Sequence, residues 1–66
     1  MTVPNRVKEF REEKVWTKAR LAREAEVALG TIDRMEIGQS TRKDRRLAVA
    51  RALGKPYHEA FPNNID

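Results

Sequence analysis

Positively charged side chains are concentrated in one short stretch of this 66-residue sequence, which carries a formal net charge of +4. Within residues 42–55 the only acidic residue is Asp44, whereas the basic residues there are Arg42, Lys43, Arg45, Arg46, Arg51 and Lys55. Such an excess favours a polyanionic partner, and nucleic acid before a membrane surface. The alternative interpretation is a solvated helix face that has no partner.

The sequence contains too few histidine, serine and cysteine residues to form a catalytic or metal site. His58 is the only histidine, Ser40 is the only serine, and cysteine is absent. Zinc sites need several Cys or His ligands, and no glycine-rich phosphate-binding motif is present. We therefore expect no enzyme activity, no metal and no cofactor. The lack of cysteine, of a signal peptide and of a long apolar run predicts a cytoplasmic protein without a membrane partner.

The spacing of apolar residues predicts a single all-α domain over residues 1–66, with a core over 5–61 and loose ends at 1–4 and 62–66. Helices are expected over 5–14, 18–25 and 28–37. A fourth helix would be capped by Thr41 and closed by Gly54, and a fifth would begin at Pro56 and run through Phe61. The side chains expected in the core are Val7, Phe10, Trp16, Leu21, Ala22, Ala25, Ile32, Met35, Leu47, Val49, Ala50, Leu53, Tyr57 and Phe61.

The segments 18–25 and 28–37 are the centre of this arrangement. They meet at a bend near Glu26, where the backbone needs a left-handed residue that Glu adopts only at some cost. Thr17 is a suitable N-cap for the first of them. Two short helices joined by a tight turn, with both apolar stripes on one core, predict a helix-turn-helix. In that motif the second helix lies in the major groove of DNA.

The sequence resembles the helix-turn-helix domains of phage repressors and Cro proteins over roughly residues 5–61. The resemblance depends on the joint spacing of Arg11, Thr17, Leu21, Ala22, Val27, Thr31, Ile32, Arg34, Glu36, Gly38, Ala52, Leu53, Gly54 and Phe61. It implies a compact five-helix bundle with a central helix-turn-helix. It also implies a nucleoid-associated, sequence-specific transcription regulator, with repression as the expected mode.

The resemblance implies a role for each matching position. Base contacts are expected from Lys18, Ala28, Leu29, Gly30 and Arg34. Phosphate contacts are expected from Thr17, Thr31, Arg42, Lys43 and Arg46. A structural ion pair is expected between Arg11 and Glu36.

Several positions depart from the family pattern. Lys18 replaces the usual Gln, Glu26 the usual Gly, and Ala28 the usual Ser or Thr. Leu29 and Gly30 bring no hydrogen-bonding side chain to the groove, so Arg34 is the main candidate for a bidentate guanine contact. For Lys18, the alternative to a base contact is a contact with a phosphate.

Useful affinity would normally require a homodimer on double-stranded DNA, with half-sites about 34 Å apart. Only residues 57–65 offer a candidate dimer contact. Two other functions stay open. The first is a protein-interaction module on the same fold, suggested by Leu29 and Gly30. The second is an architectural or recombination accessory protein whose binding depends mainly on phosphates.

Overall fold

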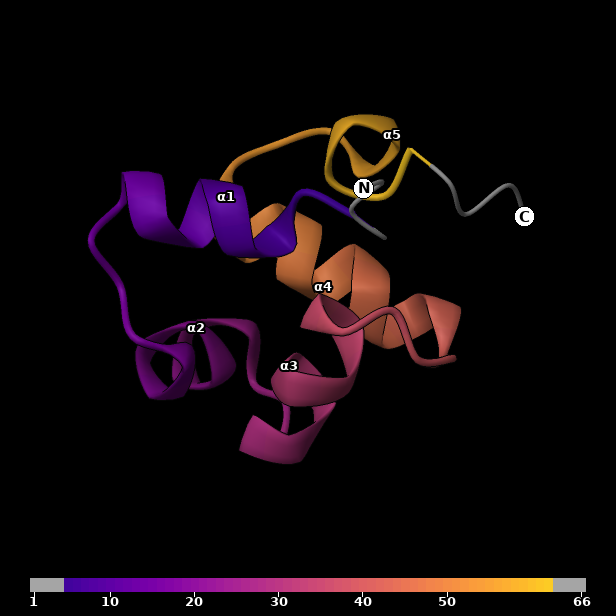
Figure 1. Ribbon diagram of the computed structural model, residues 1–66, viewed down its shortest axis with the longest axis horizontal. Helices are drawn as coiled ribbons and strands as arrows, with labels where there is room; N and C mark the ends of the chain where they lie inside the picture. Colours follow the sequence, from indigo (N-terminus) through magenta and orange to yellow (C-terminus); the bar gives the residue numbers. More distant parts are fainter. Residues whose placement is uncertain (1–4, 63–66) are drawn as a thin grey trace.

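The computed structural model describes residues 5–62, and five helices make up most of this part of the chain (Figure 1). They are α1 (Val7–Glu13), α2 (Lys18–Ala25), α3 (Leu29–Glu36), α4 (Lys43–Leu53) and α5 (Tyr57–Ala60). No strand occurs among the described residues. The prediction of a compact all-α fold is therefore confirmed, with helix ends within two residues of those expected. Of the predicted loose ends at 1–4 and 62–66, all residues except 62 lie outside the described part of the chain.

Helix α4 is the element on which the others pack, since it contacts α1, α2 and α5, while α3 packs on α1 and α2. Figure 1 shows it partly covered by α1 and α3 and reached from α3 by a short connection. One core lies between the helices, and α2 and α3 turn their apolar stripes towards it as predicted. Its buried members are Val7, Phe10, Leu21, Ala22, Ala25, Ile32, Met35, Val49, Ala50, Leu53, Ala60 and Phe61.

The buried face of α4 differs from the predicted one. Leu47 was expected in the core but is 42% exposed, whereas Arg46, expected on the surface, is only 7% exposed. The Arg46 Nε donates to the Tyr57 hydroxyl at 2.9 Å, and its Nη1 donates to the Thr41 carbonyl. With its guanidinium satisfied in this way, the aliphatic stem of Arg46 completes the stripe with Val49, Ala50 and Leu53 at helical spacing.

Four of the described helices end in the same way, each followed by a residue with a left-handed backbone. These residues are Val15 (φ 57°), Glu26 (φ 58°), Gly38 (φ 87°) and Gly54 (φ 73°). In each case the next residue donates its N–H back to the carbonyl five positions earlier, as from Val27 to Ala22 at 3.0 Å. This is the Schellman arrangement, in which glycine is the favoured left-handed residue. The left-handed Glu26 agrees with the sequence prediction.

The sequence predicts a threonine N-cap for both α2 and α4, and the structure confirms only the cap of α2. The Thr17 hydroxyl accepts a hydrogen bond from the Arg20 N–H at 3.0 Å, so Thr17 caps α2. Helix α4 instead has Arg42 at its N-cap, and no side chain caps it there. Thr41 is wrong as the cap because it lies one residue too early, where its carbonyl accepts from Arg46.

An ion pair between Arg11 and Glu36 joins α1 to the C-terminal end of α3. Arg11 Nε lies 2.8 Å from Glu36 Oε2, and the two side chains are only 10% and 5% exposed. Arg11 also donates to the Trp16 carbonyl at 2.8 Å, so it fixes the connection that leads into α2. Trp16 itself is half-buried against the core, with the Arg20 guanidinium 4.9 Å from its ring.

Candidate nucleic-acid interface

The first turn of α3 is open to solvent. Ala28, the N-cap of α3, is exposed and makes no side-chain capping bond, and Leu29 is 48% exposed. Gly30 is also exposed, and a Cβ placed on it would meet no atom within 4 Å. These three small or apolar residues therefore form a surface that another molecule can approach closely.

Lys18 and Asp33 connect the start of α2 to the middle of α3 on this surface. Lys18 Nζ lies 2.9 Å from Asp33 Oδ1, and both side chains are about half exposed. The hydrogen bond and the charge of Asp33 raise the pKa of Lys18. Sequence reasoning predicted a contact role for Lys18 but missed its partner. The pair presents a donor and an acceptor side by side.

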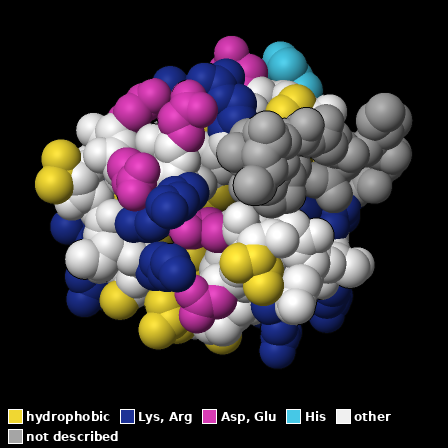
Figure 2. Space-filling view, viewed as in Figure 1, with side chains coloured by type: hydrophobic (Ala, Val, Ile, Leu, Met, Phe, Trp, Pro, Cys, Tyr) yellow, Lys and Arg dark blue, Asp and Glu magenta, His cyan; other side chains and the backbone are white. Residues whose placement is uncertain are grey.

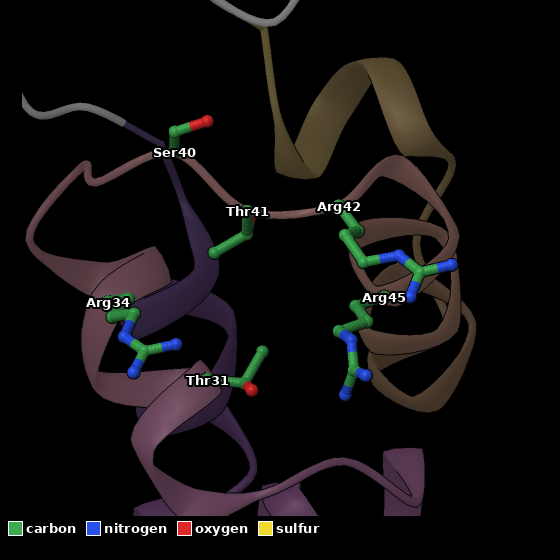
Figure 3. A pocket seen from close by; sticks show the side chains of 6 residues that line it. All are labelled: Thr31, Arg34, Ser40, Thr41, Arg42 and Arg45. Carbon is green, nitrogen blue, oxygen red and sulfur yellow. The ribbon is translucent and has the colours of Figure 1, made fainter.

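A hollow of about 400 Å³ lies beside α3, between that helix and the start of α4 (Figure 3). Its lining consists of Thr31, Arg34, Ser40, Thr41, Arg42 and Arg45, so it contains three arginines and no acidic side chain. In Figure 3 the guanidinium groups of Arg34 and Arg45 extend from facing walls, with the Thr31 side chain between them. The Arg42 side chain extends along the outside of α4.

The arginines of the hollow differ in their partners. Arg42 Nε lies 3.3 Å from Asp44 Oδ1, in a pair that is mostly exposed. Within residues 5–62, neither Arg34 nor Arg45 forms an ion pair. Arg45 also stands in the first turn of α4, where the helix dipole is positive and disfavours a cation. The hollow therefore holds two arginines, Arg34 and Arg45, whose charge no acidic side chain within residues 5–62 neutralises.

This concentration is not a general property of the surface. On the face seen in Figure 2, acidic side chains lie interspersed with Lys and Arg. Exposed ion pairs of ordinary helical spacing, such as Arg6 with Glu9 and Arg20 with Glu24, account for several of these charges. At the hollow, by contrast, an anionic partner would meet two arginines that have no acidic partner within residues 5–62.

The remaining predicted phosphate contacts have different outcomes. Thr17 is exposed, although its hydroxyl already accepts from Arg20. Lys43 is exposed, with its ammonium 5.9 Å from the Tyr57 ring. Thr31 is only 6% exposed and faces the hollow. Arg46 is only 7% exposed, and its guanidinium is bonded to Tyr57 and Thr41, so little of it is open to a phosphate.

Arg45 lines the hollow, although the sequence did not predict it as a contact residue. Arg42 and Arg45 are three residues apart, and that spacing would have placed them on one side of the fourth helix. The sequence held no signal that this side faces Arg34. Arg34 and Arg45 come to line one hollow only because of the path that residues 37–42 take between α3 and α4.

Over residues 5–62, no group of three or more His, Cys, Asp or Glu side chains could hold a metal ion. None of the helices there is long and apolar enough to cross a membrane. No protein-family model matches the sequence, and no curated protein matches it either.

Proposed function

We propose that this protein is a sequence-specific DNA-binding regulator of transcription, acting as a repressor, with α2 and α3 as a helix-turn-helix. The observation that carries the proposal is the arginine hollow beside the exposed first turn of α3. A helix that projects into the major groove needs an open surface at its N-terminal end and cations at its edges for the phosphates. Helix α3 combines both features.

In this proposal the first turn of α3 approaches the bases closely, because Ala28 and Gly30 have small side chains or none. Leu29 supplies an apolar surface for a thymine methyl group. Lys18 and Asp33 would determine base selectivity, since an ammonium suits the acceptors of guanine and a carboxylate suits the amino group of cytosine. They lie 2.9 Å apart, so they would present a donor and an acceptor side by side to a base pair.

Phosphate contacts would come from residues on both sides of α3. Thr17 and the start of α2 lie on one side, and Arg42 and Lys43 lie on the other, at the start of α4. These contacts would set the register of α3 without carrying sequence information. One such domain reads few bases, so we propose that two copies bind a two-fold site.

The test is selection of bound duplexes from a random pool, followed by titration of the selected duplexes at low and near-physiological salt. A recovered two-fold motif whose binding persists at the higher salt would support a dimeric, sequence-specific regulator. Enrichment of no motif, with affinity that collapses as salt rises, would instead indicate an architectural protein that binds phosphates alone. No binding to any duplex would refute the proposal.

A protein-interaction module is the second candidate, because α3 also exposes apolar side chains. Leu29 is 48% exposed, and Ile37, at the C-cap of the same helix, is 67% exposed. A salt-resistant protein complex that Leu29→Ser or Ile37→Ser abolishes, together with absent DNA binding, would favour this function over DNA recognition.

A further inference from the structure

We propose that the hollow between α3 and α4 binds a single phosphate group, held between the guanidinium groups of Arg34 and Arg45. Under the proposed function this group is a DNA phosphodiester, and to that extent the inference rests on that function. A free phosphate is the other possible source of the same chemistry. In either case Arg34 contacts phosphate, in place of the guanine predicted from the sequence.

The first argument is the electrostatics of the two arginines. Arg34 and Arg45 extend towards one space from opposite walls, and no acidic residue lines that space. Like charges that face each other repel, and neither has an acidic partner within the described residues. An anion between them would remove the repulsion, and guanidinium groups bind phosphate oxygens through paired, charge-assisted hydrogen bonds.

The second argument is the hydroxyl of Thr31, which lies between the two arginines. Thr31 lines the hollow, and its hydroxyl has no hydrogen-bond partner in 5–62 but stays accessible to water there. Because the side chain faces the hollow, a phosphate oxygen there would accept a hydrogen bond from it.

The third argument is the shape and position of the hollow. A volume of about 400 Å³ is ample for one phosphate with the sugar or water next to it, and its open side allows a polymer backbone to enter. The start of α4 adds the positive end of a helix of 11 residues.

The free-phosphate experiment uses the full chain and sodium phosphate as the probe, at ionic strength kept constant with sodium chloride. Amide chemical shifts would be followed by NMR. We expect saturable shifts centred on residues 31, 34 and 40–45, lost in Arg45→Gln and reduced in Thr31→Val. Arg51→Gln is the matched control, because Arg51 is exposed on the same helix but does not line the hollow.

The DNA experiment uses a duplex in which each phosphate is replaced in turn by an uncharged methylphosphonate. We expect one linkage per site whose neutralisation weakens binding of the wild type and of Arg51→Gln but leaves Arg45→Gln unchanged. Arg45→Gln should also lower the slope of log affinity against log salt by about 0.9, the value for one lost phosphate contact. Thermal unfolding of each variant would show that the fold is retained.

The outcomes separate this inference from the proposed function. Phosphate shifts at the hollow without binding to any duplex would support the inference with free phosphate as the source, and would refute DNA binding. Duplex binding with the linkage-specific effect would support both proposals. If duplexes bind but Arg45→Gln behaves like Arg51→Gln in both experiments, the hollow is not a phosphate site, and DNA recognition stands without it.

Discussion

Arg11 and Glu36 form a nearly buried ion pair, with 2.8 Å between Arg11 Nε and Glu36 Oε2, and a second contact of 3.3 Å from Nη2 to Oε1. The pair connects α1 to the end of α3, and Arg11 also holds the Trp16 carbonyl. It therefore fixes the position of α3, the proposed reading helix, relative to the rest of the fold.

We predict that removing one partner, as in Glu36→Gln or Arg11→Ala, destabilises the protein by roughly 3–5 kcal/mol, because a buried charge loses its counter-charge. Urea unfolding followed by circular dichroism would measure the loss. The double variant Arg11→Met with Glu36→Met is the control, since it leaves no unpaired charge and should be markedly more stable than either single change. Equal stability of the single and double variants would contradict this explanation.

Val15 and Glu26 have left-handed backbones that L-amino acids with a Cβ adopt at a cost. We predict that Val15→Gly and Glu26→Gly each stabilise the fold by about 1 kcal/mol, after the greater entropy of glycine in the unfolded chain is subtracted. Val15 is 90% exposed, so its replacement loses no packing. Thermal unfolding would measure the effect.

Gly54→Ala is the matched control for these two changes. Gly54 has φ +73°, and a Cβ there would meet no atom within 4 Å, so backbone strain alone should decide the result. We expect Gly54→Ala to lower the melting temperature. A rise there, or a fall in the Val15 and Glu26 variants, would show that the left-handed conformations are not the source of the differences.

Tyr57→Phe removes the hydroxyl that accepts from Arg46 Nε at 2.9 Å. Because Arg46 is 7% exposed, water cannot easily replace that partner, and we predict a loss of about 1–3 kcal/mol in the free energy of unfolding. Chemical denaturation would measure the loss. DNA affinity of the folded variant should stay unchanged; a selective loss of DNA binding at unchanged stability would instead return Arg46 to the phosphate role predicted from the sequence.

Asp33→Asn should alter base preference without altering stability, since the pair with Lys18 is exposed to solvent. The amide can donate as well as accept, so we expect the preference for cytosine to relax at one position of the selected motif. Repeating the duplex selection with this variant would test the prediction. An unchanged motif would exclude Asp33 from base reading.

Arg34→Ala separates the two roles considered for Arg34. A phosphate contact predicts affinity that falls by a similar factor on every duplex, with a shallower salt dependence. A guanine contact, as the sequence alone suggested, predicts a loss of about 1–3 kcal/mol that is confined to duplexes with guanine at one position. Titration of a set of single-base variants of the selected site would distinguish them.

The sequence alone determined the features that depend on neighbouring residues. The positions of five helices, the capping hydroxyl of Thr17, the left-handed turn at Glu26 and the stop at Gly54 all follow from local chemistry and helical spacing. Most core positions followed as well, because apolar residues repeat at the helical period.

Only the tertiary structure decided which charged residues are buried, which are paired and which face one another. Periodicity assigned Leu47 to the core and Arg46 to the surface, but Arg46 is buried because Tyr57 and the Thr41 carbonyl happen to lie within its reach. The pairing of Lys18 with Asp33, and the hollow shared by Arg34 and Arg45, join residues from different helices. Such contacts depend on how the helices cross, and a one-dimensional pattern of residue types does not contain that information.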